Sequence, residues 1–311
     1  MNSNHVQRDA PLCSLCSEPA VLYQRNIDRH LCGTHFTEDV KFRVAETVKS
    51  RQMIIPGDRV AVALSGGKDS TALLLLLNQL LPAWEDVRLI AITIDEGIFG
   101  YREETIQSAE LLTRQLGIEH HCISFNELFG DSLDTFLKGR EPQACSICGI
   151  LRKKAMVVGA QRIGATKLAT GHNLDDEAQS VLMNVFRSDL PRLVRNSALN
   201  SSGIFIPRIK PLSLISEKEI AMYLIQNDAW RVLPECPYTS YALRREVRSL
   251  LSGFEYKHPG TMLHLLETKK KIEHYCSGSV ISAPLHSCRK CGDPTSGDFC
   301  QVCSLLQSLG K

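Results

Sequence analysis

The 311-residue sequence predicts an α/β fold: a doubly wound parallel sheet flanked by N- and C-terminal zinc-binding modules. Strand-like and helix-like stretches alternate through its middle, which is typical of a parallel sheet with both faces covered. Cysteine pairs lie near both ends, and the chain has 12 cysteines in all. In a reducing compartment, cysteines in such pairs are more often metal ligands than disulfides.

The composition is that of an ordinary globular protein, with 43% hydrophobic and 23% charged residues and a net charge of +2. This charge gives no overall signal for polyanion binding, so a nucleic-acid surface has to come from local clusters of Lys and Arg. The N-terminus is polar and does not resemble a signal peptide. The most apolar run, residues 71–84, contains Asn78 and Pro82 and is too short to cross a bilayer. We therefore expect a cytoplasmic protein with no membrane association.

Short apolar runs rich in β-branched residues mark the strands of the predicted sheet. "RVAVAL" (59–64) and "VRLIAITID" (87–95) are the clearest of these runs. Strands are expected over residues 59–64, 87–95, 119–125, 166–171 and 208–212. Helices are expected over about 68–81, 101–116, 149–163, 174–188, 216–227 and 241–275. The last of these helices is basic, with Arg244, Arg245 and Arg248 near its start.

Both ends of the chain carry a full set of ligands for a structural Zn²⁺, which prefers four thiolate or imidazole ligands. The N-terminal set is "CSLC" followed by "CGTH", and His35 is favoured over His30 because His30 is too close to Cys32. The C-terminal set consists of two Cys-x-x-Cys pairs. The expected ligands of the two zinc ions are Cys13, Cys16, Cys32 and His35, and Cys288, Cys291, Cys300 and Cys303. We divide the chain into an N-terminal zinc finger (1–36), a catalytic domain (37–240), a basic helical segment (241–285) and a C-terminal zinc ribbon (286–311).

The stretch "SGGKDS" (65–70) lies where the first expected strand ends and a helix begins. Gly66 and Gly67 allow a tight turn that brings backbone N–H groups close to a phosphate. The helix N-terminus adds partial positive charge, and Ser65 and Ser70 add hydroxyl donors. Asp69 is placed to help hold Mg²⁺. The spacing is not that of a Walker loop.

This stretch resembles the SGGxDS loop of the N-type ATP pyrophosphatases, the PP-loop family. The resemblance implies that ATP is cleaved between its α- and β-phosphates and that AMP is transferred to a carbonyl-type oxygen. A second motif, "ATGHNLDDEA" (169–178), also follows a strand and so lies at the same edge of the sheet. We expect Gly171, His172 and Asp176 to face the ATP site. Alternatively, the acidic residues of this motif only complement a helix dipole.

Five cysteines remain between the two terminal sets, and three of them form a further candidate group: Cys145 and Cys148 in "CSIC", and Cys236 in "PECPYT". Cys122 falls inside an expected strand, where we predict it to be buried and inert, and Cys276 has no recognisable partner spacing. Three thiolates can hold a 4Fe-4S cluster and leave one iron open. Spacing alone does not separate this cluster from a zinc site or a redox-active pair.

Together SGGKDS, Cys-x-x-Cys-Gly, GHNLDDE and ECPY resemble the TtcA/TtuA family of tRNA thiolases. The terminal cysteine sets resemble the TtuA branch and its archaeal and eukaryotic wobble-uridine relatives. The resemblance implies 2-thiolation of a tRNA uridine, a 4Fe-4S cluster on Cys145, Cys148 and Cys236, and a homodimer. It is compatible with sulfide or a ubiquitin-like thiocarboxylate carrier as sulfur donor. Arg152 stands where T-loop enzymes have a catalytic lysine, and this favours the wobble uridine over the T-loop uridine.

The expected mechanism places the ATP phosphates on residues 65–70 and the adenosine near Asp95. Lys68, Arg152 and Asp176 are expected to stabilise charge while the uridine C2 oxygen takes AMP. The basic helices and the zinc modules are expected to contact tRNA phosphates. Two alternatives are an amide-forming PP-loop ligase and an RNA-binding scaffold whose ATP site regulates docking.

Overall fold

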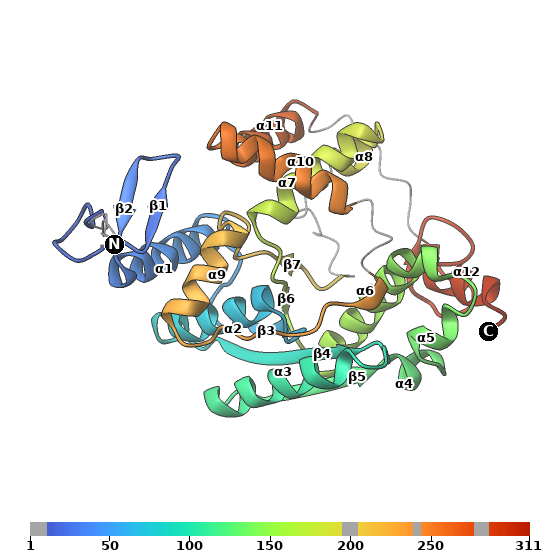
Figure 1. Cartoon of the computed structure of the whole chain (residues 1–311). Coiled ribbons are helices and arrows are strands. Elements are labelled where there is room, and N and C mark those ends of the chain that lie inside the picture. Colours follow the sequence, from blue (N-terminus) through green and yellow to red (C-terminus); the bar gives the residue numbers. More distant parts are fainter. Residues whose placement is uncertain (1–10, 195–204, 239–243, 277–285) are drawn as a thin grey trace, which may run out of the picture.

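The fold is seen in a computed structural model that describes residues 11–194, 205–238, 244–276 and 286–311. A five-stranded parallel sheet lies at its centre, in the order β5-β4-β3-β6-β7 (Figure 1). This confirms the predicted doubly wound α/β sheet. Its strands are β3 (Arg59–Ala63), β4 (Arg88–Asp95), β5 (His120–Ser124), β6 (Lys167–Ala169) and β7 (Arg208–Ile209).

Helices cover both faces of the sheet because side chains alternate along each strand. Val60 and Val62 of β3 point into one apolar core, whereas Ala61 belongs to the other. The first core is covered by α1 (Gly33–Ser50), α2 (Lys68–Leu80), α3 (Arg102–Leu116) and α9 (Glu217–Gln226). The second is covered by α4 (Phe125–Phe129), α5 (Leu133–Phe136), α6 (Ala144–Arg162) and α12 (Gln301–Ser308).

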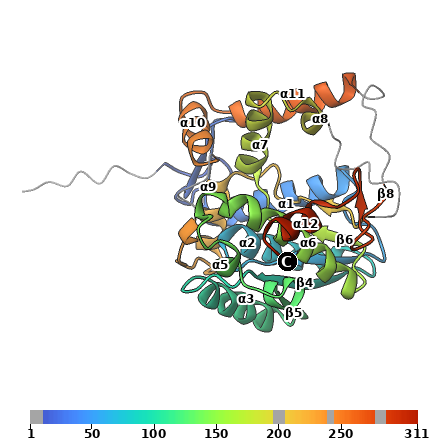
Figure 2. The same ribbon diagram turned by 90° about the vertical axis from the view of Figure 1, so that its right-hand side faces the viewer.

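Four further helices form a lobe beside the sheet, seen at the top of Figures 1 and 2. They are α7 (Leu174–Phe186), α8 (Leu190–Leu193), α10 (Arg244–Lys257) and α11 (Thr261–Tyr275). Helices α7, α10 and α11 share a small apolar core that includes Ala178, Val247 and Met262. The stretch expected to be helical over 241–275 is therefore two helices, since the chain turns at Gly260, whose φ is +95°. Residues 241–243 lie outside the described part.

The two ends fold into small hairpins. One is formed by β1 (Leu22–Gln24) and β2 (Arg29–Leu31), and the other by β8 (His286–Ser287) and β9 (Pro294–Thr295). Two 3₁₀ turns, Leu81–Ala83 and Glu141–Gln143, complete the regular structure. Within the described ranges, no helix has the length and apolar character needed to cross a membrane.

Three expectations about local structure are corrected. Helix α6 starts at Ala144 instead of near residue 149, so Cys145 and Cys148 lie on its first two turns. Helix α1 was not predicted, although its buried Phe36, Val40, Val44 and Val48 recur every four residues, and it spans the proposed boundary at 36 and 37. Cys122 is exposed instead of buried, because β5 is an edge strand.

Candidate active site

The phosphate loop connects β3 to α2 and is held closed by its own hydroxyls. The Ser65 N–H donates to Ser70 Oγ (3.1 Å), and Ser70 Oγ donates to the carbonyl of Gly67 (2.9 Å). Gly66 has a φ of +86°, and a Cβ there would lie 2.1 Å from the carbonyl oxygen of Thr105. The loop therefore packs directly on α3, and only glycine fits at this position.

The second motif meets the phosphate loop at the carboxyl edge of the sheet. Gly171 packs so closely that a Cβ would lie 3.0 Å from the backbone of Asp69 and Ser70. The Asn173 side chain donates to Asp69 Oδ1 over 2.9 Å. His172 lies beside it, with Nδ1 2.9 Å from Thr170 Oγ1. The structure thus brings the two predicted ATP motifs into contact.

Asp176 has a structural role at the start of α7. Asn173 caps this helix by accepting the Asp176 N–H (2.9 Å), and the Asp176 carboxylate accepts the Asn173 N–H (3.3 Å) in return. This reciprocal arrangement is a capping box. The acidic residues of this motif were given two alternative roles, at the ATP site or at the helix start. The structure shows that Asp176 stabilises the start of α7.

Lys68 is fixed by two carboxylates. Its Nζ lies 2.8 Å from Asp69 Oδ2 and 2.9 Å from Glu217 Oε1. Burial alone would lower the pKa of Lys68, but these two carboxylates raise it above its usual value. The lysine is consequently charged throughout the physiological pH range.

The three internal cysteines lie near the start of α6. Cys145 and Cys148 belong to its first two turns, and the segment around Cys236 passes beside them. Cys148 and Cys236 pack against the same apolar core, and Cys145 Sγ lies 3.8 Å from the carbonyl oxygen of Tyr238. Tyr238 is anchored by its hydroxyl, which donates to Asp134 (2.8 Å). Burial raises the pKa of the Cys148 thiol to about 12, although nearby Arg152 opposes the shift. Burial also raises the pKa of Cys236.

A chain of charged side chains joins this cysteine group to the phosphate loop; Glu96 and Arg102 are buried, whereas the Arg152 side chain is about half exposed. Arg152 Nη1 lies 3.7 Å from Glu96 Oε1, and Glu96 Oε2 lies 2.8 Å from Arg102 Nε. Arg102 also donates to the carbonyl of Ser65 (3.2 Å). Asp95, directly before Glu96, accepts the Gly97 N–H (2.9 Å) and shapes the turn after β4.

Glu96 and Arg102 were missed from the sequence. Both side chains are 5% exposed, so a buried ion pair lies between the two halves of the site. Glu96 directly follows a strand of the parallel sheet, and that position was the available signal. Arg102 carried no such signal, because its contacts depend on how α3 packs.

The two terminal groups meet the geometric requirement of a single ion. In each group one atom from every ligand residue lies within 4.8 Å of the others. Cys16 and Cys32 have Sγ atoms 3.7 Å apart, and Cys291 and Cys300 have Sγ atoms 3.6 Å apart. A tetrahedral ion with metal–sulfur bonds of about 2.3 Å needs sulfurs about 3.8 Å apart. His35, not His30, joins the N-terminal group.

The internal cysteines differ from the two terminal sets. Among the described residues, Cys145, Cys148 and Cys236 are not one of the sets whose ligand atoms all lie within 4.8 Å of one another. Cys148 and Cys236 pack at the edge of an apolar core and Arg152 lies near Cys148, and thiols are the donors that iron–sulfur clusters require.

Comparison with known proteins agrees with this geometry. The family described as "PP-loop domain" matches residues 36–249. The tRNA 2-thiolation protein NcsA of Haloferax volcanii is 34% identical over 321 residues, covering 96% of this chain and 98% of the relative. The chain belongs to the PP-loop family of tRNA 2-thiolation proteins. Cytoplasmic tRNA 2-thiolation protein 1 of Caenorhabditis briggsae is also similar, at 35% identity over 97% of this chain and 82% of its own length.

A solved structure extends the likeness of this tRNA 2-thiolation protein to the fold. The U34-tRNA thiolase NcsA from Methanococcus maripaludis, with its 4Fe-4S cluster, matches with a TM-score of 0.83 and 31% identity. The match covers 96% of this chain and 97% of that chain. The preference for the wobble-uridine branch, drawn from Arg152, is confirmed by these relatives.

Proposed function

We propose that this protein 2-thiolates a tRNA uridine, the wobble uridine U34, in a reaction that cleaves ATP to AMP and pyrophosphate. One observation carries the proposal: the Glu96–Arg102 pair links the cysteine group to the phosphate loop, so both face one reaction site. An ATP-dependent amide ligase has no use for three thiols beside its nucleotide. The relatives named as tRNA 2-thiolation proteins and as a U34-tRNA thiolase support the same activity.

The phosphate loop provides the groups that activate the uridine. Residues 65–70 bind the ATP phosphates through backbone N–H groups and the Ser65 and Ser70 hydroxyls, while Gly171, His172 and Asp95 line the nucleotide site. The uridine, turned out of its stack, attacks the α-phosphorus through its C2 oxygen, and pyrophosphate leaves. Lys68 and Arg152 stabilise the negative charge that develops, and Asp176 lies at the same edge. Sulfur then attacks C2, and AMP departs with the former C2 oxygen.

Metal ions complete this proposal. Asp69 holds Mg²⁺ at the phosphates, since its carboxylate lies in the loop. Cys145, Cys148 and Cys236 hold a 4Fe-4S cluster, which supplies an iron with an open position for sulfur. Arg152 keeps the surroundings of the three thiols positively charged. The two terminal groups hold structural Zn²⁺.

The partners follow from the same proposal. The tRNA lies along the basic helices α10 and α11 and the zinc modules, where Lys and Arg contact its phosphates. Sulfide or a ubiquitin-like thiocarboxylate carrier donates the sulfur. The protein acts in the cytoplasm as a homodimer. Its parts are the zinc finger 1–36, the catalytic domain 37–240, the basic segment 241–285 and the ribbon 286–311, and helix α1 continues from the first part into the second.

An anaerobic assay tests the proposal. Iron-reconstituted protein is incubated with unmodified tRNA, Mg-ATP and sulfide, and the tRNA is digested for mass spectrometry. We expect 2-thiouridine at position 34 from the natural chain and none from Cys236→Ala, which stays folded. Asp69→Ala is expected to form no AMP. Thiolation at the T-loop uridine would replace the assigned target, and full activity of Cys236→Ala would remove the cysteine group from the reaction.

A further inference from the structure

Glu217, the first residue of α9, lies at the meeting point of four helices. Its carboxylate accepts from Lys68 Nζ of the phosphate loop (2.9 Å) and also pairs with Arg248 of α10. Its backbone N–H donates to Asp175 Oδ2 of α7 (2.7 Å). None of the sequence motifs includes Glu217, yet it touches the phosphate loop directly.

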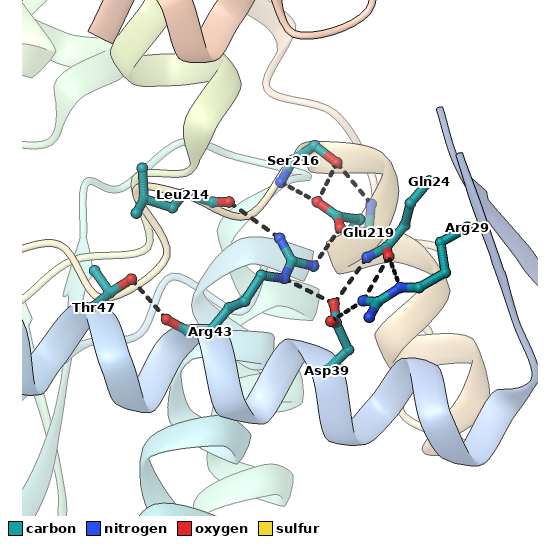
Figure 3. Close-up of polar contacts among 8 residues, drawn as sticks. All are labelled: Gln24, Arg29, Asp39, Arg43, Thr47, Leu214, Ser216 and Glu219. Atoms are coloured by element: carbon teal, nitrogen blue, oxygen red, sulfur yellow. Dashed lines mark hydrogen bonds and ion pairs between the residues drawn. The ribbon is translucent and has the colours of Figure 1, made fainter. Parts of the chain in front are cut away.

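The start of α9 is also held by contacts with α1 (Figure 3). Ser216 and Glu219 form a capping box, with the Ser216 N–H 2.9 Å from Glu219 Oε2. Arg43 of α1 pairs with this same Glu219 and donates to the carbonyl of Leu214 (3.4 Å). Ser216 and Glu219 at this helix start are therefore both engaged.

That support extends to the N-terminal hairpin. Arg43 Nε donates to Asp39 Oδ2 (2.8 Å), and Asp39 also accepts from Gln24 Nε2 (2.8 Å) and pairs with Arg29. Gln24 and Arg29 lie on β1 and β2, beside the N-terminal ligand group. The network connects the start of α9, where Glu217 lies, to α1 and to the N-terminal hairpin. Such support from neighbouring elements is what a positioning group requires.

We propose that Glu217 is a positioning residue that sets the place of Lys68 in the phosphate loop. An ammonium group has three N–H donors. Asp69 and Glu217 accept two of them, so the Nζ position is fixed and the third N–H is directed to a phosphate oxygen. Arg248 offsets the negative charge that Glu217 would otherwise place near the phosphates. The inference rests on the proposed ATP-dependent thiolation.

Two substitutions alter the contact of Glu217 with Lys68 in different ways. Glu217→Gln keeps the shape and removes the charge, whereas Glu217→Asp keeps the charge at the helix start and shortens its reach to Lys68. Both are expected to lower kcat for tRNA-dependent AMP formation by about tenfold, with KM for ATP changed by less than about threefold. Glu104→Gln is the matched control, an exposed first-turn glutamate of α3, and is expected to behave as the natural chain.

The split between kcat and KM, together with thermal unfolding, gives a second readout. A purely structural role of Glu217 would lower the thermal unfolding midpoint and leave kcat per folded molecule unchanged. A positioning role lowers kcat of the folded variant while KM for ATP stays nearly the same.

The outcomes are distinguishable from failure of the proposed function. If the natural chain forms AMP and 2-thiouridine while both variants keep kcat within about twofold, the positioning role is wrong. If Glu217→Gln does not fold, Glu217→Asp carries the kcat prediction alone. Absence of AMP and thiolated tRNA from the natural chain would contradict the proposed function instead.

Discussion

A single added methyl group should disrupt the phosphate loop at Gly66 and be tolerated at Gly67. Gly66 has a φ of +86°, which costs an alanine about 1–2 kcal/mol. Its Cβ would also lie 2.1 Å from the Thr105 carbonyl oxygen, so the loop would have to move by about 1 Å to reach an ordinary carbon–oxygen contact of about 3.3 Å. Gly66→Ala is therefore expected to lose stability and to misplace the phosphate-binding N–H groups.

Gly67 is the matched control in the same loop. Its φ is −72°, and the nearest atom to an added Cβ is Ser65 Oγ at 3.5 Å. Alanine is a poorer helix cap than glycine, but it restricts the unfolded chain more, so these effects nearly cancel. Without ATP, Gly67→Ala should unfold close to the natural temperature.

Thermal unfolding and AMP formation check both variants. For Gly66→Ala we expect a midpoint lower by about 2–4 °C or more and AMP formation reduced by about a hundredfold. Equal unfolding midpoints for the two variants, together with natural AMP formation by Gly66→Ala, would refute the close packing of the loop on α3.

Three further predictions concern other contacts. Arg43→Met leaves the largely buried Glu219 without its cation and Asp39 with Arg29 alone, so thermal unfolding should show a loss of about 2 kcal/mol. An unchanged midpoint would contradict the network of Figure 3. In metal-free protein, iodoacetamide should modify the exposed Cys145 before Cys148. The Cys148 thiol reacts more slowly because it stays protonated below its pKa of about 12. Equal rates of modification, measured by mass spectrometry, would contradict the burial of Cys148. Lys154 contacts both carboxylate oxygens of Asp293 (2.7 and 2.6 Å), joining the C-terminal module to α6. A double-mutant cycle of Lys154→Met and Asp293→Asn should give about 1 kcal/mol of coupling, and additive effects would exclude a stabilising bond.

Local sequence patterns were enough to predict the sheet and its motifs. The β3 and β4 runs are apolar on both faces because helices cover both, and the glycines after β3 mark the phosphate loop. The terminal ligand groups were predicted from spacing, since Cys-x-x-Cys brings two thiols onto one turn.

The remaining parts depend on packing between distant segments. Glu96 gave only its place after a strand. Arg102 gave no signal because its contacts depend on how α3 packs, and Glu217 gave none because its partners Lys68 and Arg248 lie far away in sequence. Helix α6 was predicted to start too late, since two cysteines and a preceding proline obscured its first turn. Cys122 was predicted to be buried because the sequence does not reveal which strand lies at the edge of the sheet.

Isotope transfer tests the central claim most directly. Unmodified tRNA carrying oxygen-18 at C2 of the target uridine is incubated anaerobically with iron-reconstituted protein, Mg-ATP and sulfide. If the C2 oxygen attacks the α-phosphorus and AMP then leaves, the released AMP carries the heavy oxygen in proportion to the 2-thiouridine formed. Formation of 2-thiouridine with unlabelled AMP would contradict the account, because ATP would then have activated a group other than the uridine.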